Sequence, residues 1–512
     1  MPLSPPSGVS SSIKRTGIFI TSRLGVGSRS AGAAALAILL LANKLSTGLA
    51  PVNTPVKITA VEDSVTQHGI GSEMYGLVRK VFDQNGQPNI TCVAVAENGS
   101  AVAATATLAF ATNATTDGVI RVTVKGVLLE EVTVQSGTTP TQAATAVRDV
   151  VNNRPELPVT ASSAAGTVTL TARQKGPRGN LISVRAEFSV NTSMTVALNG
   201  GTASTSVSGK MGTGTATPGS GADTFQNAID AVYAQKYDRI VAACDDATNI
   251  ALFKAWMTQA AAIMEGRLQQ TVIGLVSDLP TAVTQSTATN NARIQFGWHY
   301  NADDLPGEIA AQLAAARVYG DGELKGEESY RAANLDSVQL LTTRVQPVAA
   351  DEPNGTEINS ALSAGLTPLV RSASNPGFVE IHRSVTSRFL DSNNVPNYAV
   401  LDTSKVTVTD YIADDLRSKI ANEFRGKNLA PDPEDDRGPE SPDVVYPSMI
   451  KGFIADQLIE YERRGLIVLV RENLYKLVVE IDVTNPALVI SYIPADVIEG
   501  FHTFAGEVQQ IG

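Results

Sequence analysis

Cysteine, aromatic residues and charged residues are all scarce in this chain of 512 residues. It contains two cysteines, and aromatic and charged residues make up 5% and 18% of it, whereas ordinary soluble domains carry roughly 25% charge. Cys92 and Cys244 each lie inside an apolar run, a setting that favours core thiols in a reducing compartment over a disulfide. The low charge suggests that part of the surface is covered in an assembly.

Long apolar runs and basic blocks are missing as well. The most apolar stretch, at 31–42, is too short for a membrane-spanning helix, which needs about 20 residues, and the Ser-rich segment before it argues against a signal peptide. Lys and Arg total 40 against 51 Asp and Glu, which gives a net charge of -11. Because no Lys/Arg-rich block occurs, we expect no direct contact with nucleic acid and no membrane insertion.

Sequence motifs for chemistry are also missing. The histidines are scattered, at His68, His299, His382 and His502, so no zinc-ligand spacing occurs. The segment 208–211 departs from a phosphate-binding loop, and the acidic, Pro-rich segment 430–443 lacks the ligand pattern of an EF-hand. No Gly-x-Ser-x-Gly elbow occurs either. We therefore expect no catalytic residue, no metal and no cofactor, and a protein that is not an enzyme.

Alternating helices and strands dominate two stretches of the chain. Strands up to position 41, at 56–59 and at 90–95, with helices across 61–82, predict a helix-covered sheet. The alternation returns between 225 and 319, at a spacing that implies a mostly parallel sheet. A chain of this length holds about two to four domains.

The stretch between them, at about 100–220, is rich in Thr, Val, Ala and Gly. Apolar and polar residues alternate with period two, as in Thr167–Ala172, and one helix is expected at 141–152. The closing run Gly212–Gly221 has the composition of a flexible linker. The pattern predicts a β-rich domain inserted into the α/β unit.

The last third of the chain has an α+β pattern. Apolar residues at four-residue spacing from Val408 to Phe424 predict a long helix that ends near Gly426. A second helix is expected at 448–464, followed by strands at 466–471, 475–483 and 487–493. Each end of the chain adds a further strand candidate, Gly17–Thr21 and 501–510.

Several stretches have an order and spacing seen in one protein family. In the N-terminal part they are Leu39–Ile58, a strand with an Asn-Thr-Pro-Val turn, and Gly69–Arg79, a helix start. Further stretches are Leu157–Ala161, Val168–Asn180, Lys236–Val241, Val379–Val385 and Tyr398–Asp402. Together they resemble the tail sheath proteins of contractile-tailed, myovirus-type phages, most closely the Mu-like branch. The segments 430–443 and 31–42 do not map onto that pattern.

The resemblance implies a multidomain α+β and α/β fold. A helix-covered sheet and an α+β C-terminal domain would form the core, with an inserted β-rich domain and extended terminal arms. The expected divisions are an N-terminal arm (1–30), the first part of the α/β core (31–99), the inserted outer domain (100–220), the rest of the core (221–350), the C-terminal domain (351–499) and a C-terminal arm (500–512).

The family also implies a function as a structural subunit of a contractile tail sheath. Subunits would assemble in the host cytoplasm as stacked hexameric rings around the tube of the virion tail. Contraction from a metastable extended state would drive the tube through the host envelope during genome delivery. Expected partners are further copies of the chain, the tail tube protein, and baseplate and tail terminator or neck proteins. Alternatives are the sheath of a bacteriocin or injection system and, more distantly, a surface adhesin or an unrecognised α/β enzyme.

The contacts between sheath subunits are expected at the chain ends. In this family terminal arms add strands to sheets of neighbouring subunits. Here the arm residues would be Gly17, Ile18, Phe19, Ile20, Thr21, Phe501, Thr503, Phe504 and Val508. The receiving sheet would consist of 466–471 and 475–483, with Leu477, Val479 and Ile481 alternating with polar neighbours. Lys451, Asp456 and Glu460 on the helix 448–464 are candidates for facing the tube, with simple core packing of that helix as the alternative.

Overall fold

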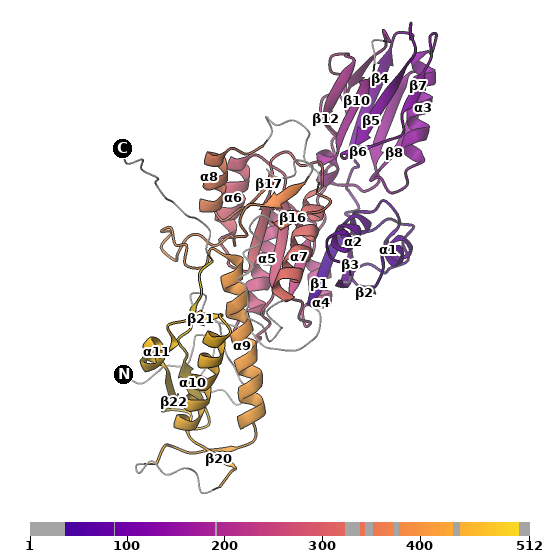
Figure 1. The fold of residues 1–512 in the computed structure, drawn as a ribbon. Helices are drawn as coiled ribbons and strands as arrows, with labels where there is room; N and C mark the ends of the chain where they lie inside the picture. Colours follow the sequence, from indigo (N-terminus) through magenta and orange to yellow (C-terminus); the bar gives the residue numbers. More distant parts are fainter. Residues whose placement is uncertain are drawn as a thin grey trace, which may run out of the picture.

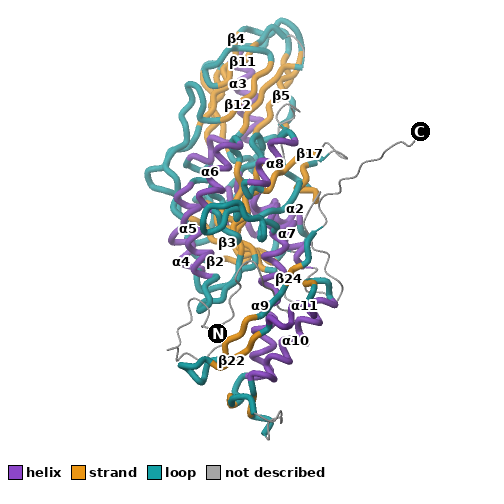
Figure 2. Tube along the Cα trace, turned by 90° about the vertical axis from the view of Figure 1, so that its left-hand side faces the viewer, coloured by secondary structure: helices purple, strands orange, loops and turns teal. Residues whose placement is uncertain are grey.

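A computed structural model describes residues 36–86, 88–189, 192–322, 338–343, 352–372, 378–433 and 441–500. Both arm candidates, 17–21 and 501–510, lie outside the described residues. The described chain forms an elongated molecule, with a β-rich domain at one end, an α/β body in the middle and a helical C-terminal module at the other end (Figures 1 and 2).

The body is built on a nine-stranded sheet in the order β16-β18-β17-β15-β14-β13-β1-β3-β2. Its strands are β1 (Ala37–Asn43), β2 (Pro55–Ile58), β3 (Asn89–Val95), β13 (Arg239–Ala242), β14 (Gln270–Leu275), β15 (Ile294–Trp298), β16 (Val338–Leu340), β17 (Thr367–Arg371) and β18 (Val379–Ile381). The six inner strands β3, β1, β13, β14, β15 and β17 pair in parallel, so the expectation of a mostly parallel sheet is confirmed. The sheet extends to Ile381, and the division expected near 350 therefore falls inside it.

Helices cover both faces of this sheet, which is why its central strands are apolar throughout. Ile38 and Leu40 of β1 pack in one core with α2 (Glu73–Gln84) and α7 (Pro306–Gly322). Leu39 and Leu41 pack in another with α4 (Gln226–Val232) and α5 (Ala247–Ala260). Three further helices, α1 (Val61–His68), α6 (Leu279–Thr289) and α8 (Gly355–Ser363), complete the layers. Cys92 and Cys244 are free and buried in the two different cores, as expected of core thiols.

The order in which the parallel strands of the body are added reverses at β1. In chain order the first five are β1, β3, β13, β14 and β15, and they lie in the order β3-β1-β13-β14-β15. The chain thus proceeds to one side of β1 with β3 and to the other side with β13, which makes the β1/β13 boundary the topological switch point of a doubly wound sheet. The inserted domain occupies the connection from β3 to β13.

The inserted domain is a two-layer β structure closed by one helix. One sheet has the order β11-β4-β9-β8, and the other has the order β12-β10-β5-β6 with β7 paired to β5. Its elements are β4 (Thr105–Ala111), β5 (Gly118–Val124), β6 (Val127–Leu128), β7 (Val132–Val134), α3 (Pro140–Asn152), β8 (Val159–Ala164), β9 (Thr167–Ala172), β10 (Ser183–Phe188), β11 (Thr195–Leu198) and β12 (Ser206–Lys210). Val168, Leu170 and Ala172 of β9 point inward, as the period-two pattern predicts. The predicted β-rich insertion is present.

The run Gly212–Gly221 is not the flexible linker that its composition suggested. The Gly212 N–H donates to the Thr105 carbonyl at 2.7 Å, and Val102 and Ser220 form an antiparallel bridge. Its glycines are needed for close approach: a Cβ on Gly219 would lie 2.3 Å from the Gly176 carbonyl oxygen. The two chain crossings between body and inserted domain are therefore hydrogen-bonded to each other, and composition alone misidentified the segment.

The C-terminal module packs two long helices against short strands. Its elements are α9 (Thr403–Phe424), β19 (Asn428–Leu429), β20 (Val444–Val445), α10 (Pro447–Arg463), β21 (Ile467–Val468), α11 (Val470–Asn473), β22 (Val478–Ile481), β23 (Val489–Tyr492) and β24 (Asp496–Val497). The apolar stripe of α9 packs against α10, and Gly426 follows the helix end with a φ of 87°. Both predicted helices are confirmed. The strand expected at 466–471 is wrong beyond Val468, because Leu469 adopts a φ of 56° and α11 begins.

Candidate functional site: the C-terminal sheets and the two domain junctions

The receiving sheet expected at 466–471 and 475–483 does not exist as one sheet. Strand β21 pairs with β24, and β22 pairs with β23, in two separate two-stranded sheets. The turn at Leu469 and the helix α11 separate β21 from β22, and no pattern of alternating residues marks this break. The sequence thus located strands in the right region but joined the wrong pair.

The three residues proposed for that sheet lie at or beside β22. Leu477, one residue before the strand, is buried, Val479 is buried and Ile481 is half-buried, while Glu480 is exposed. The alternation then reverses, because Asp482 is buried and accepts hydrogen bonds from Thr484 and Asn485, while Val483 is 82% exposed. Leu477 and Val479 therefore serve the core of the module.

Several large apolar side chains remain exposed around the two small sheets. They are Leu469, Tyr475, Val483 and Tyr492, with exposures of 52%, 78%, 82% and 52%. An isolated two-stranded sheet is marginally stable in water and has two open edges. The surface near β22 and β23 thus combines open strand edges with uncovered apolar side chains, a combination typical of a strand-accepting surface.

The three residues proposed to face a tube lie on the helix α10. Lys451 and Asp456 are exposed, and Glu460 is half-buried and forms an ion pair with Arg463. Ile450, Ile454 and Leu458 are buried against α9 and β22. At about 100° per residue, Asp456 lies opposite this buried stripe, whereas Lys451 lies at its flank.

A buried polar group holds α9 and α10 together. The Tyr461 hydroxyl donates to an Asp415 carboxylate oxygen, and the Tyr411 and Tyr461 rings meet edge to face at 6.4 Å between centroids. Burial and the neighbouring Asp415 raise the pKa of Tyr461, so the hydroxyl remains a donor. The two helices thus form one rigid unit within the module.

The junction between the inserted domain and the body contains buried charge. The turn Pro177–Leu181 of the inserted domain carries Arg178, whose Nε lies 2.7 Å from Glu73 Oε1 and whose Nη2 lies 3.2 Å from Asp223 Oδ2. The same Nη2 donates to Asn43 Oδ1 at 2.5 Å. Glu73 begins α2 and Asn43 ends β1. Arg178 of the inserted domain thus contacts polar side chains of the body.

Two further carboxylates of the body receive cations from the inserted domain. Lys125 pairs with Glu308 of α7, and Arg185 Nη2 lies 2.8 Å from Asp303 Oδ1. Burial would raise the pKa of Glu308, but Lys125 and Lys80 hold this pKa below its ordinary value. Arg178, Lys125 and Arg185 therefore each face a buried carboxylate of the body.

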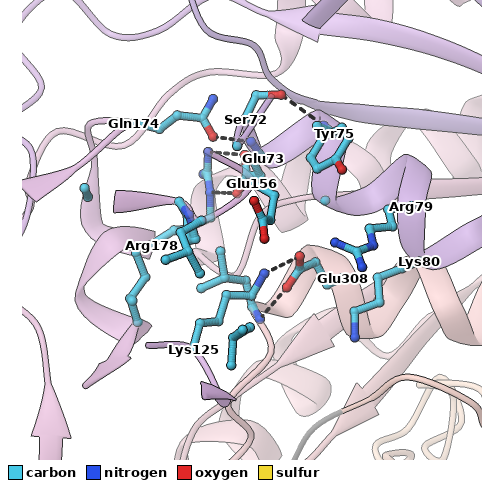
Figure 3. Close-up of a pocket in the computed structure, with 18 of the residues that line it drawn as sticks. Ser72, Glu73, Tyr75, Arg79, Lys80, Lys125, Glu156, Gln174, Arg178 and Glu308 are labelled. Carbon is cyan, nitrogen blue, oxygen red and sulfur yellow. Dashed lines mark hydrogen bonds and ion pairs between the residues drawn. The ribbon is translucent and has the colours of Figure 1, made fainter. Parts of the chain in front are cut away.

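A cavity of about 310 Å³ lies within this junction (Figure 3). Its lining includes Glu73 and Gln174 on one side and Lys80, Lys125 and Glu308 on the other. Lys80 Nζ also lies 2.6 Å from Asp304 Oδ2. The space is large enough for several water molecules, so these charged side chains line a cavity and not a closely packed interface.

The junction between the C-terminal module and the body is also built on arginines. Arg293 makes two contacts with Asp410 of α9, of 2.6 and 2.7 Å, and Arg239, which pairs with Asp321 of the body, donates to Thr407 of α9 at 3.0 Å. Arg317 donates to Gln270, Gln295 and Thr407 at 2.9–3.1 Å. All of these side chains are buried. The N-terminal half of α9 is therefore fixed to the body by polar contacts closed off from solvent.

The arginines of both junctions escaped sequence reasoning. Arg178 lies in the quoted stretch Val168–Asn180, as part of Gly176-Pro177-Arg178-Gly179. The sequence shows a cationic residue between turn residues, in a connection between two strands. It does not show the partners of that residue, because Glu73 and Asp223 are distant in the sequence. Arg293 and Asp410 are likewise 117 positions apart.

Among the described residues no group of His, Cys, Asp and Glu side chains could hold a metal ion. No helix of the described part is long and apolar enough to span a membrane.

Comparison with known proteins identifies a curated relative over almost the full length. No family model matches the chain. The tail sheath protein of Mu-like prophage FluMu from Haemophilus influenzae is 23% identical over 479 residues, which cover 93% of this chain and 92% of that protein.

Among solved structures, similarity is found to sheath tail proteins from Desulfitobacterium hafniense (TM-score 0.45, 14% identity, 91% of this chain and 98% of that one) and Listeria innocua (0.47, 12%, 92% and 94%). A third is the contracted helical sheath of the anti-feeding prophage (0.47, 10%, 99% and 100%). TM-scores of this size do not establish a shared fold, so the assignment rests on the curated relative. The resemblance of this chain to the tail sheath proteins of contractile-tailed phages, Mu-like branch, is confirmed.

Proposed function

We propose that this chain is the structural subunit of a contractile tail sheath and has no enzymatic role. The likeness to the FluMu tail sheath protein over 93% of the chain carries the proposal. Subunits form stacked hexameric rings around a tail tube and move from a metastable extended arrangement to a better-packed one. The inserted domain lies on the outside of the sheath, and the baseplate, neck and tube proteins are further partners in the virion tail.

Subunits join by strand addition in this proposal. The arm residues 17–21 and 501–508 of one subunit pair with open edges of β21–β24 or β22–β23 in neighbouring subunits, which covers Tyr475, Val483 and Tyr492. Two observations support this role: within the described residues each small sheet has two strands, and large apolar side chains beside them are exposed. Added strands give the backbone hydrogen bonds and apolar contacts that such sheets lack.

Truncation tests the strand addition. Deleting 1–22 or 500–512 is expected to leave soluble monomers that do not form tubes in negative-stain electron microscopy. Deleting only 1–12 keeps the strand candidate Gly17–Thr21 and is expected to leave tube formation intact. Normal tubes from either of the longer deletions would contradict the proposal, and so would monodisperse small particles of the full chain under all buffer conditions.

The tube contact is assigned to the exposed face of α10. A charge reversal at Lys451 and Asp456, K451E with D456K, is expected to weaken assembly around a tail tube while sheath-only tubes still form. The matched control is D149K on the inserted domain, which also changes an exposed charge. Because K451E with D456K leaves the net charge unchanged, equal loss of tube binding in both variants would assign the effect to altered surface charge in general, against this role of α10.

A further inference from the structure

The crevice at the switch point of the central sheet is the place where doubly wound proteins bind ligands. It lies outside the carboxyl ends of the strands, between the two that lead in opposite directions. In this chain those strands are β1 and β13. Asn43 is the last residue of β1, and Asp245 follows β13 by three positions.

Acidic groups of the body converge on this crevice. Glu73, from the first turn of α2, and Asp223, which precedes α4, are both buried there. Burial raises the pKa of Glu73 and of Asp245, and the Arg178 guanidinium opposes the rise in both cases. The crevice is thus a carboxylate-lined receptor for a cation.

The occupant of the crevice is a guanidinium group from the inserted domain. Arg178 is 6% exposed and uses Nε and Nη2 to contact Glu73, Asp223 and Asn43 at 2.5–3.2 Å. Its guanidinium carbon lies 6.0 Å from the centroid of the Phe225 ring. Planar donors directed at two carboxylates with an aromatic ring beside them form a site specific for guanidinium over ammonium.

The Asp223 carboxylate also connects the two chain crossings between the body and the inserted domain. Asp223 Oδ1 accepts from the Asn98 N–H at 2.6 Å, and the Asn98 side chain donates to the Ala222 carbonyl at 3.0 Å. Asp223 therefore bridges the outgoing crossing, the returning crossing and Arg178. Removing the guanidinium leaves Glu73 and Asp223 close together and uncompensated, at the point where the inserted domain attaches.

We propose that the switch-point crevice is a guanidinium-binding site that the chain fills with its own Arg178, and that this residue positions the inserted domain on the body. The crevice in which other doubly wound proteins bind a ligand here binds a side chain of the same chain and so fixes the orientation of the inserted domain. The proposal holds independently of the sheath function, because it depends only on contacts within one chain.

Chemical rescue tests the site. Arg178→Ala is expected to lower the midpoint of thermal unfolding of the full chain by about 3–5 °C, because two buried carboxylates lose their partner. Guanidinium chloride at about 20 mM, far below unfolding concentrations, is expected to recover at least a third of this loss. Sodium chloride at the same concentration is expected to recover none, and the wild type is expected to show no gain from either salt.

A second readout separates positioning from general stability. Hydrogen exchange at 98–102 and 219–223 is expected to accelerate at least tenfold in Arg178→Ala and to slow again with guanidinium, while exchange in β14 stays unchanged. The matched control Arg121→Ala removes the exposed pair with Glu131 and is expected to respond equally to guanidinium and sodium. Equal responses of Arg178→Ala to the two salts, or unchanged exchange at the crossings, would overturn the proposal.

Failure of the variant to fold does not remove the test. If Arg178→Ala is insoluble, its refolding yield is measured from urea with guanidinium or sodium chloride at about 20 mM. A several-fold higher yield with guanidinium supports the site, and equal yields contradict it.

Discussion

The two junctions of the α/β body use the same chemistry and differ in their access to solvent. At the inserted domain, Lys125 and Arg185 keep 12% and 20% of their side-chain surface exposed, and Lys125 lines a cavity of about 310 Å³. At the C-terminal module, the Arg293 and Asp410 side chains are only 4% and 6% exposed. Breaking an ion pair costs more free energy where water cannot replace the lost partner. Arg293 is therefore closed off from solvent at the C-terminal module, whereas the inserted domain combines one buried arginine, Arg178, with two pairs, those of Lys125 and Arg185, whose cations solvent can reach.

This difference matches the tasks that the proposed function gives to the two ends. A module that joins subunits must transmit force to the body, which requires a contact that does not open. An outer domain needs only a defined orientation. Four substitutions test the comparison, from the largest expected effect to the smallest.

Arg293→Ala is expected to have the largest effect, a loss of about 3–5 kcal/mol in the free energy of unfolding, because Asp410 stays buried without its partner. Urea unfolding followed by circular dichroism measures the loss. A loss below about 1 kcal/mol would show that water enters this junction and would remove the contrast with the inserted domain.

Gly71→Ala is expected to cost about 2–3 kcal/mol. Gly71 has a φ of 79°, and a Cβ there would lie 2.5 Å from the Pro155 carbonyl oxygen and 2.7 Å from that of Leu157. Alanine would strain the backbone at this positive φ, and its Cβ would push the carbonyl groups of the inserted domain away from the body. Gly99→Ala, where a Cβ meets no atom within 4 Å, is the control, and an equal change in the two variants contradicts the proposed close contact.

Lys125→Ala is expected to cost about 1–2 kcal/mol at neutral pH, since Lys80 and the nearby cavity still compensate Glu308. The pKa of Glu308 is lowered in the folded chain, so its stabilising contribution is present above the unfolded pKa of about 4.3 and is lost as the pH falls further. Unfolding measured between pH 7 and pH 3 is therefore expected to show a smaller acid loss in Lys125→Ala than in the wild type. Parallel pH profiles would rule out this pair as a source of acid sensitivity.

Arg121→Ala is expected to have the smallest effect on stability of the four, because Arg121 and Glu131 are 39% and 47% exposed and such pairs contribute little. A loss as large as that of Lys125→Ala would mean that exposure does not determine the strength of these pairs.

Local patterns predicted much of the fold, and their failures have identifiable causes. Strict apolar spacing predicted α9 and α10, because a helix buries one stripe. The helix α6 was missed, since its Thr- and Ala-rich sequence has no strong stripe. The strand expected at 466–471 ended early at Leu469, where the chain turns into α11. The Gly212–Gly221 run was mistaken for a flexible linker, because the hydrogen bonds that order it come from residues about 100 positions earlier.

The sequence by itself determined the family resemblance, the parallel sheet, the inserted β-rich domain and the reduced cysteines, because each depends on composition or on spacing within one segment. Only the tertiary structure decided the pairing of β21 with β24 and β22 with β23, the switch point at β1, and the contacts of Arg178 and Arg293. Those contacts join residues up to 135 positions apart. A buried charge finds its partner through the path of the whole chain, which no local pattern records.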